Sequence, residues 1–392
     1  MKKIVSLIMV AVLLITSSLT SFAYTESKIE AERENTQYAS AIELDVPGAY
    51  LMEASTGKVL YSKGEYTAAS PASVTKIMTL LIVCEALADG LISLGDKVSV
   101  SASAASMGGS QVFLEEGERM SVEELIKCTV IASANDAAVA LAEHTFGNEA
   151  AFVKKMNERA GTLGLKNTHF ENVSGLDDTT TDHYSCPADI AKMSAELLNH
   201  DIILKYSSMW QDTIRDGEFT LTNTNRLVRY YDGCNGLKTG STDKAGFCVS
   251  ATAKRGNMQL IAVIMGAKTR DERNNAARAL LDYGFSNFAL YECPEEYIED
   301  AYVARGTEDS AALHSSKFSV VVPKDKMSKI EKIYDIPQTL TAPVRDGDVV
   351  GKIKYFVDGE QIGVSEILVA GYVPAIDMWQ IFARILRRIS VG

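Results

Sequence analysis

Strand-like segments at both ends of a long helical stretch constrain the fold of this chain more than any other sequence feature. Strand patterns cover about residues 41–61, helical patterns follow from about 71 to 205, and strand patterns return between 218 and 266. A helix is expected over Arg270–Tyr283. Because packed elements share one core, both groups of strands should join one sheet with helices on it, beside a separate helical lobe. The sequence therefore predicts an α/β (α+β) domain over residues 41–292.

The sequence changes character after about residue 293. Short alternating segments such as Phe318–Pro323 and Val349–Phe356 are broken by Asp-Gly pairs at 346–347 and 358–359. Asp-Gly between alternating segments is typical of β-hairpins. A small all-β, β-sandwich-like domain is therefore expected over residues 293–372.

The last segment, 373–392, predicts an amphipathic helix. The apolar residues that recur at helical spacing are Ile376, Trp379, Phe382, Ile385, Leu386 and Ile389. The arginines that cluster near the end are Arg384, Arg387 and Arg388. This pattern favours a helix in a membrane interface with its arginines on anionic lipid headgroups. The alternative is a helix that docks on the β domain.

The N-terminal 23 residues have the pattern of a signal peptide. They begin with two lysines, continue with an apolar run over 4–15 and end in a Ser-Phe-Ala cleavage site at 21–23. The run is shorter than the ~20 residues of a membrane span, although a retained N-terminal anchor is the alternative. Residues 24–40 are polar without periodicity and predict a tether. We therefore expect an exported protein that works at the outer face of the cytoplasmic membrane or in the cell wall.

Charge and cysteine content exclude several classes of function. The formal net charge is −12, which argues against a nucleic-acid partner because such partners require a basic face. Six cysteines in an exported chain would allow disulfides, but Cys84 and Cys128 lie in apolar helical patterns, which favours free buried thiols. The sequence has no Cys-x-x-Cys, His-x-His or His-Glu-x-x-His, so neither a metal nor another cofactor is expected.

A serine followed three residues later by a lysine is a candidate nucleophile with its base. Such pairs occur at Ser55/Lys58, Ser73/Lys76 and Ser241/Lys244. Only Ser73 stands at the start of a long apolar segment, Val74–Leu87, which predicts a buried helix. On a helix the pair shares one face, burial favours a neutral Lys76, and the helix N-terminus offers N–H groups to an oxyanion.

Ser133-Ala134-Asn135 is a second candidate element, and this Ser-x-Asn occurs once in the chain. It follows a helix predicted to begin at Ser121, with Glu124 completing a capping box. Side chains at such a break between helices can project into a site. The alternative is a plain helix junction with Asn135 as an N-cap.

Lys238-Thr239-Gly240 is the third element, and it also occurs once. It lies in a strand-like segment after Gly236. A strand edge with a side-chain-free glycine lets an extended peptide lie alongside. The alternative is an edge strand that its lysine protects from aggregation.

Together the three elements resemble the signature of the penicillin-binding and serine β-lactamase superfamily. The surrounding segments resemble serine D-Ala-D-Ala carboxypeptidases, the low-molecular-mass penicillin-binding proteins, over about residues 40–390. These segments are Pro71–Thr79, Ser133–Ala137, Asn172–Leu176, Asn223–Asn225, and Gly236–Thr242 followed by Ala245-Gly246. The resemblance implies an antiparallel sheet with helices on it, a helical lobe, the small β domain and the C-terminal anchor. It also implies roles in cell-wall maturation and cell shape.

The resemblance further implies the reaction. Ser73 would attack the carbonyl between the terminal D-alanines of a peptidoglycan stem pentapeptide, with Lys76 as base and Ser133 carrying a proton to the leaving amine. Water would then hydrolyse the acyl-enzyme, and β-lactam antibiotics would act as covalent inhibitors. How Lys76 and Ser133 share the acylation proton stays open.

Binding roles follow from the same resemblance. Asn135 would hold the substrate amide, and the segment Lys238-Thr239-Gly240 would lie along the substrate, with Lys238 and Thr239 facing the terminal carboxylate. The backbone N–H groups of Ser73 and Ser241 would form the oxyanion hole. Arg273 matches the carboxylate-binding arginine, with Arg270 as its rival.

Three other functions remain as alternatives. A class A β-lactamase would add a Glu-x-x-x-Asn loop, whereas here Glu171 stands directly beside Asn172. Endopeptidase or transpeptidase activity could be the main reaction of the same site. A non-catalytic penicillin or peptidoglycan sensor would normally have lost a catalytic residue, and none is missing.

Overall fold

The computed structural model describes residues 42–178 and 180–391. The predicted signal peptide and tether therefore lie outside the described residues. The chain divides into two units between Phe285 and Ser286. This boundary precedes the expected one at residue 293, because β10 (Phe288–Cys293) pairs with β13 (Phe318–Pro323) of the second unit.

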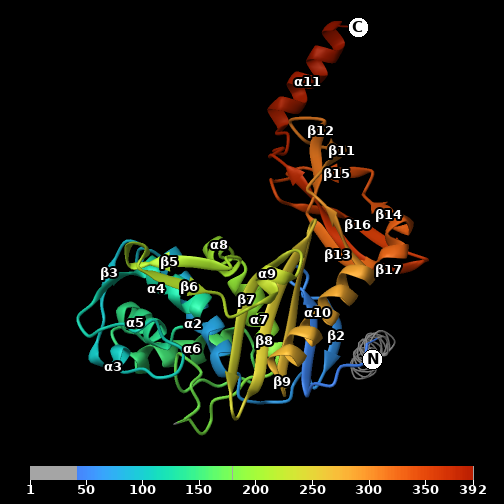
Figure 1. Cartoon of the computed structure of the whole chain (residues 1–392). Helices are drawn as coiled ribbons and strands as arrows, with labels where there is room; N and C mark the ends of the chain where they lie inside the picture. Colours follow the sequence, from blue (N-terminus) through green and yellow to red (C-terminus); the bar gives the residue numbers. More distant parts are fainter. Residues whose placement is uncertain (1–41, 179, 392) are drawn as a thin grey trace, which may run out of the picture. The chain divides into compact units, whose positions relative to one another are not determined.

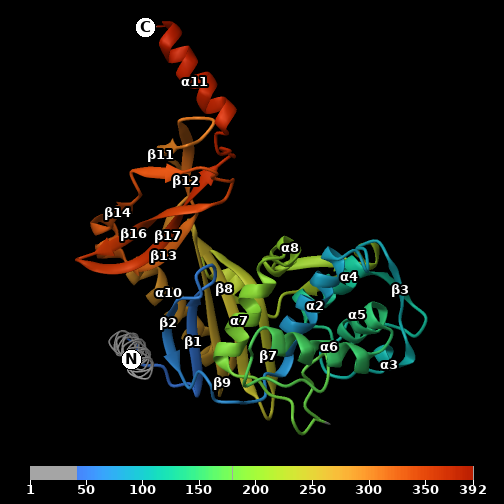
Figure 2. The same ribbon diagram turned by 180° about the vertical axis from the view of Figure 1, so that it is seen from behind.

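The first unit is built on a five-stranded antiparallel sheet in the order β2-β1-β9-β8-β7. Its strands are β1 (Gly48–Glu53), β2 (Val59–Lys63), β7 (Cys234–Thr242), β8 (Gly246–Arg255) and β9 (Met258–Ala267). The N-terminal hairpin thus completes a sheet whose other strands lie about 200 residues later, as predicted. Helix α7 (Pro187–Leu197) covers one face and α10 (Arg270–Asn287) the other (Figures 1 and 2).

The helical lobe packs around α2 (Lys76–Ala88), whose side chains are buried on nearly every side. The predicted capping box is present, with Ser121 and Glu124 bonded reciprocally at the start of α4. The other helices here are α3 (Ala102–Ala105), α4 (Val122–Lys127), α5 (Asn135–Phe146), α6 (Glu149–Thr162), α8 (Asp201–Ser207) and α9 (Leu227–Tyr230). Two two-stranded antiparallel sheets complete this part, β3 (Lys97–Ser99) with β4 (Arg119–Ser121) and β5 (Gln211–Ile214) with β6 (Phe219–Thr222).

The second unit is all-β apart from short turns and its last helix. A six-stranded sheet in the order β14-β16-β17-β12-β11-β15 accompanies the β10–β13 pair. Its strands are β11 (Tyr297–Ala304), β12 (Ser310–Ser315), β14 (Glu331–Asp335), β15 (Thr339–Thr341), β16 (Val349–Val357) and β17 (Glu360–Ala370). Asp358 and Gly359, both at positive φ, make the predicted hairpin turn between β16 and β17. Phe318 stacks on Tyr355 at 3.9 Å between ring centroids, which joins the two sheets through one core.

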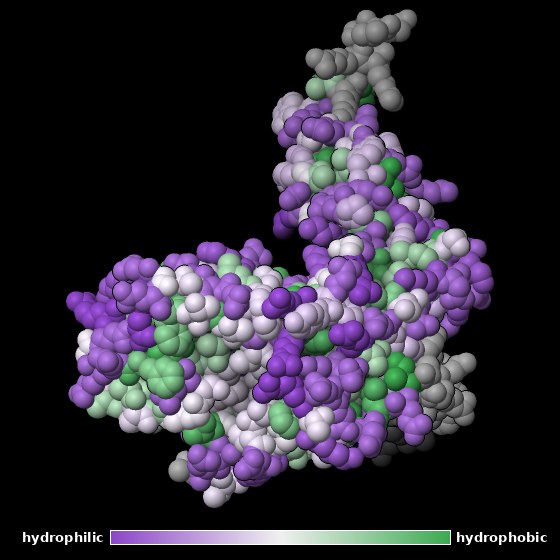
Figure 3. Space-filling model, in the orientation of Figure 1, coloured by the Kyte–Doolittle hydropathy of each residue, from purple (hydrophilic) through white to green (hydrophobic). Residues whose placement is uncertain are grey.

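Helix α11 (Met378–Val391) forms where an amphipathic helix was predicted. Its apolar side chains are exposed, with Trp379 81% and Ile389 72% accessible, so the described residues do not bury this face. The surface seen in Figure 3 is otherwise mainly hydrophilic, with apolar residues in separate patches. Among residues 42–178 and 180–391, no helix has both the length and the hydrophobicity to cross a membrane.

Candidate active site

Ser73 lies in a 3-10 turn, Ala72–Thr75, that leads into α2. The predicted helix from Val74 therefore begins as this tighter turn. Ala72 has a φ of 47°, a strained value for a residue with a Cβ atom. Gly175 lies against it so closely that an added Cβ would come within 1.8 Å of the Ala72 carbonyl oxygen. Ser73, the candidate nucleophile, thus lies in a strained turn that a neighbouring loop holds in place.

Lys76 lies one turn after Ser73 and is completely buried. Its Nζ lies 2.9 Å from Ser73 Oγ, 2.6 Å from Asn135 Oδ1 and 2.7 Å from the Ser174 carbonyl oxygen. Burial, and secondly the charge of Lys238, lowers the pKa of Lys76 well below its ordinary value. A neutral amine has two N–H donors and one lone pair. The Asn135 and Ser174 oxygens can accept both N–H groups, which leaves the lone pair for the Ser73 hydroxyl proton.

Ser133 faces this pair from the other side. It ends a π-helical turn, Cys128–Ala132, in the left-handed conformation with φ 63°. Its Oγ accepts a hydrogen bond of 2.7 Å from Lys238 Nζ, which also donates to the Thr239 carbonyl oxygen at 3.0 Å. Burial, and secondly Arg273, lowers the pKa of Lys238 to about 7.

Asn135 and Asp136 tie the start of α5 to the loop before it. Asn135 is the first residue of α5 and does not cap it; its Nδ2 donates to the Gly108 carbonyl oxygen at 2.7 Å. The buried Asp136 carboxylate accepts from the backbone N–H groups of Val112 and Leu114, each at 3.1 Å. This loop brings Ser110 into the wall of the site.

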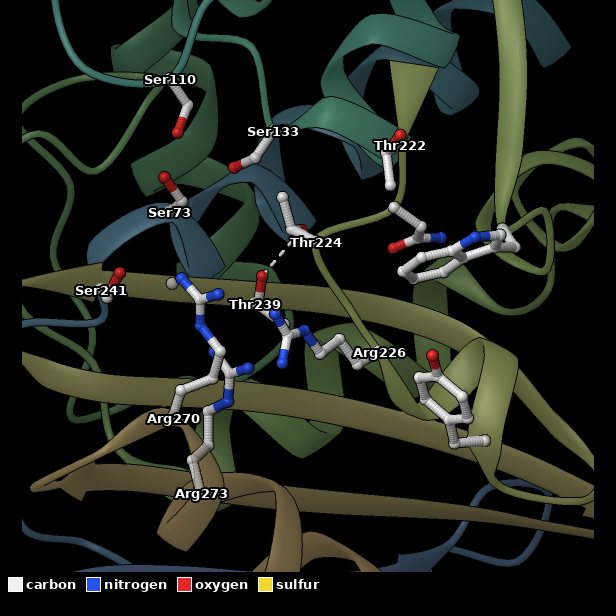
Figure 4. A pocket seen from close by; sticks show the side chains of 14 residues that line it. Ser73, Ser110, Ser133, Thr222, Thr224, Arg226, Thr239, Ser241, Arg270 and Arg273 are labelled. Carbon is white, nitrogen blue, oxygen red and sulfur yellow. Dashed lines mark hydrogen bonds between the residues drawn. The ribbon is translucent and has the colours of Figure 1, made fainter. Parts of the chain in front are cut away.

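β7 passes close beside Ser73. A Cβ on Gly240 would lie 2.8 Å from the Ser73 backbone nitrogen, so only glycine fits there without displacement. The next residue, Ser241, lines the same cavity as Ser73. Thr239 Oγ1 donates to Thr224 Oγ1 at 2.8 Å (Figure 4).

A cavity of about 560 Å³ joins these groups. The predicted site residues in its wall are Ser73, Ser133, Thr239, Gly240, Ser241 and Arg273. The predicted residues Lys76, Asn135 and Lys238 lie directly behind them, through the hydrogen bonds given above. The structure therefore brings all the predicted site residues together.

Arginines gather at the side of the cavity that Thr239 faces. Arg270, Arg273 and Arg226 all line it, and Figure 4 shows their guanidinium groups close together. Arg273 is buried, and burial, with the charges of Arg270 and Arg226, lowers its pKa to about 10. A site with this concentration of cations suits an anionic ligand.

Several contributors were not among the predicted site residues. Nothing in the spacing of Ser110 distinguishes it, whereas Asp136 and Ser174 lie in segments of the resemblance, Ser133–Ala137 and Asn172–Leu176, without a predicted role. The loop of Asn172 was part of the resemblance, and its side chain holds the turn by accepting from the Gly175 N–H at 2.7 Å. His183 is also placed by the fold: its Nδ1 accepts from the Glu171 N–H and its Nε2 contacts Thr75 Oγ1.

Across residues 42–178 and 180–391, no cluster of His, Cys, Asp or Glu has the arrangement of a metal site. The six cysteines are free thiols in the structure.

Comparison with known families matches both units. Residues 34–269 match the D-alanyl-D-alanine carboxypeptidase family of peptidases, and residues 285–375 match the C-terminal domain of penicillin-binding protein 5. D-alanyl-D-alanine carboxypeptidase DacF of Bacillus subtilis is 40% identical over 94% of this chain and 93% of its own length. D-alanyl-D-alanine carboxypeptidase DacA of Escherichia coli is 32% identical over 85% of this chain and 84% of its own length.

Solved structures agree with this assignment. Penicillin-binding protein 5 of Haemophilus influenzae has a TM-score of 0.75 at 32% identity, covering 85% of this chain and 98% of that structure. Penicillin-binding protein D2 of Listeria monocytogenes, solved with ampicillin bound, has a TM-score of 0.57 at 31% identity, covering 62% and 98%. Ser73 lies beside Lys76 and Ser133 beside Lys238, and both units of the chain match the same group of enzymes. The chain therefore belongs to the serine D-alanyl-D-alanine carboxypeptidase family.

Proposed function

We propose that this protein removes the terminal D-alanine from peptidoglycan stem pentapeptides through an acyl-enzyme on Ser73. The proposal depends on the environment of Lys76. Its buried amine lies 2.9 Å from Ser73 Oγ and donates hydrogen bonds to Asn135 Oδ1 and the Ser174 carbonyl oxygen. That arrangement makes a lysine a base rather than a cation.

Acylation begins with attack of Ser73 Oγ on the carbonyl carbon of the penultimate D-alanine. Lys76 takes the hydroxyl proton as the C–O bond forms. The carbonyl oxygen becomes negative and receives hydrogen bonds from the backbone N–H groups of Ser73 and Ser241. The close approach of Gly240 to the Ser73 nitrogen supports this role, because it brings β7 beside that N–H group.

Collapse of the tetrahedral species breaks the C–N bond, and the leaving amine needs a proton. Ser133 Oγ supplies it and is reprotonated from Lys76, which returns to neutral. The hydrogen bond from Lys238 supports the transient negative charge on Ser133 Oγ. Asn135, which binds Lys76 through its oxygen, holds the substrate amide beside Ser73.

The terminal carboxylate binds among Lys238, Thr239 and Arg273. Its charge favours the protonated form of Lys238, whose pKa is about 7 in the free site. Water then attacks the Ser73 ester, and the products are the shortened peptide and the free serine. The reaction is an amide hydrolysis overall and needs no cofactor.

β-Lactams are expected to acylate the same serine, because a strained amide next to a carboxylate presents the same groups. The exposed Glu171 is no candidate for the deacylating glutamate of a β-lactamase. Its carboxylate accepts from the backbone N–H groups of Thr181 and Asp182 and serves to hold that loop. A long-lived penicilloyl-enzyme follows.

We also propose that the protein works outside the cytoplasm, at the membrane surface. A cleaved N-terminal signal peptide would export the chain, and α11 would hold it on the outer face of the membrane. The exposed Trp379, Phe382 and Ile389 side chains supply the apolar face for the interface.

Release of D-alanine from diacetyl-Lys-D-Ala-D-Ala tests the activity, with Ser73→Ala as the inactive control. Mass spectrometry after mixing with benzylpenicillin tests the nucleophile, with an adduct on Ser73 expected. An adduct without D-alanine release would favour a penicillin sensor, and rapid loss of the adduct with multiple turnover would favour a β-lactamase. Absence of both would overturn the proposal.

Flotation with vesicles tests the anchor. The chain beginning after residue 23 is expected to bind vesicles rich in anionic lipid and to lose binding when Trp379 and Phe382 are both changed to serine. Tyr302→Ser, which alters an exposed aromatic side chain outside α11, is the control. Equal binding by all three proteins would refute the role of α11.

A further inference from the structure

The active-site cavity continues past the residues that the reaction uses. Its wall includes Trp210, Arg226 and Tyr230 in addition to the groups around Ser73. None of these three has a part in hydrolysis of a D-Ala-D-Ala bond as derived above.

The contacts made by successive residues of β7 show in which direction the cavity extends. Gly240 lies beside the Ser73 nitrogen, Lys238 contacts Ser133, and the Gly236 carbonyl oxygen accepts from Asn225 Nδ2 at 2.8 Å. Moving backward along the strand therefore leads from the nucleophile, past the carboxylate-binding residues, to the segment of Arg226. The extension lies on the leaving-group side of the bond that is cut.

The backbone of Arg226 is fixed on both sides. Asn225 and Leu227 are buried, and the Leu227 N–H donates to Asn225 Oδ1 at 3.1 Å. Asn223 accepts from the Asn225 N–H at 2.9 Å and donates to the Ser207 and Met209 carbonyl oxygens. A preorganised turn therefore presents Arg226 to the cavity, at low entropic cost for binding.

In the described part of the chain, no acidic side chain pairs with Arg226. Among the described residues, neither Arg226 nor Arg270 forms an ion pair, and the cavity wall contains no Asp or Glu. The chain as a whole is acidic, with a net charge of −12, so this group of arginines is a local exception. A D-alanine leaving group brings one carboxylate, for which the buried Arg273 is available.

Two aromatic side chains, Trp210 and Tyr230, also line the cavity. Trp210 and Tyr230 lie with ring centroids 6.4 Å apart, and Arg229 packs over both rings, 5.3 Å and 5.5 Å from their centroids. Tyr230 is held to the same turn, since its N–H donates to the Arg226 carbonyl oxygen at 3.2 Å.

We propose that Arg226, Trp210 and Tyr230 form a leaving-group subsite for a C-terminal D-amino acid whose side chain carries its own carboxylate. The inference rests on the proposed peptidase function and extends its substrate range beyond D-alanine. The chemistry is unchanged: Ser73 forms an ester with the penultimate D-alanine, the C–N bond breaks, and the larger amine leaves with the proton from Ser133. Water then releases the acyl group.

Three peptides that differ in the last residue test the subsite: diacetyl-Lys-D-Ala followed by D-Ala, D-Glu or D-Gln. D-Glu and D-Gln have nearly the same shape, so the ratio of their kcat/KM values isolates the side-chain charge. The ratio is expected to favour D-Glu by about tenfold in the wild-type enzyme, as for a hydrogen bond between charged groups. Arg226→Gln is expected to bring the ratio to about one.

Arg278→Gln is the matched control, because Arg278 is an exposed arginine outside the cavity wall. It should leave the ratio at the wild-type value. If Arg226→Gln lowers kcat/KM equally for all three peptides, Arg226 binds the terminal carboxylate and the subsite is refuted. Equal rates for D-Glu and D-Gln with the wild-type enzyme would also overturn it. Failure of the peptidase function is distinguishable, since D-Ala would then not be released from any peptide.

Discussion

Lys238→Met removes a buried amine whose burial costs stability and to which the proposed mechanism gives a role. Lys238 is 1% exposed, and burial lowers its pKa from 10.5 to about 7. The unfolded chain therefore holds a proton at neutral pH that the folded chain binds less tightly. Such a group lowers the free energy of unfolding below its unfolded pKa.

The magnitude follows from these values. The difference between a pKa of 10.5 and about 7 corresponds to about 5 kcal/mol. Methionine has a similar length and no charge, so it avoids this cost. It also loses the hydrogen bonds to Ser133 Oγ and the Thr239 carbonyl oxygen, at about 1.5 kcal/mol each. The variant should be more stable by about 2 kcal/mol near pH 6, which raises Tm by roughly 4 °C or more.

The pH dependence identifies the cause. Because the folded pKa lies below the unfolded one, wild-type stability rises with pH between about 7 and 10.5 relative to the variant. The advantage of Lys238→Met should therefore shrink by about 3 kcal/mol between about pH 6 and pH 9. Urea unfolding at both pH values measures this difference, and Lys154→Met, at an exposed lysine, should show no such change.

The activity of Lys238→Met should fall although its stability near pH 6 rises. Without the cation beside Ser133, kcat/KM for D-alanine release is expected to fall at least about a hundredfold. A variant that is less stable than wild type near pH 6, or a stability difference that does not depend on pH, would refute the reasoning.

Three further variants probe the site. Lys76→Ala should abolish the penicillin adduct on Ser73 while leaving the fold intact by circular dichroism, and normal labelling would exclude Lys76 as base. Gly240→Ala places a Cβ 2.8 Å from the Ser73 nitrogen and should lower the acylation rate by about a hundredfold, measured by stopped-flow with a chromogenic β-lactam; an unchanged rate would count against the oxyanion hole. Asp136→Ala leaves two buried N–H groups of the preceding loop without their acceptor and should cost about 2–5 kcal/mol in urea unfolding; a loss below about 1 kcal/mol would contradict that role.

Local patterns were sufficient to predict much of the secondary structure and to select Ser73 as the candidate nucleophile. The strand patterns predicted between 218 and 266 appear as β6, β7, β8 and β9. The Ser121–Glu124 capping box was visible because both partners lie in one helical turn. Ser73 was separated from the other two Ser-x-x-Lys pairs by the apolar segment that follows it.

The domain boundary and the contacts between distant residues were harder to predict from the sequence. The domain boundary lies earlier than predicted because β10 pairs with β13, and strand pairing is not encoded in either strand alone. The residues around the nucleophile show the same limit: Ser174 contributes a carbonyl from 98 positions away, and Asp136 acts through its contacts with a loop. No spacing rule in the sequence identifies such groups.

The sequence by itself determined the fold class and the residue types that the chemistry requires, because periodicity, capping and short motifs are local properties. Only the tertiary structure decided how those residues work together. Burial of Lys76 and Lys238 lowers their pKa values, and burial results from packing of the whole unit. The approach of Gly240 to Ser73 and the gathering of three arginines depend on segments that are brought side by side by the sheet. These contacts fix distances and dielectric environment, and no single segment of chain specifies either.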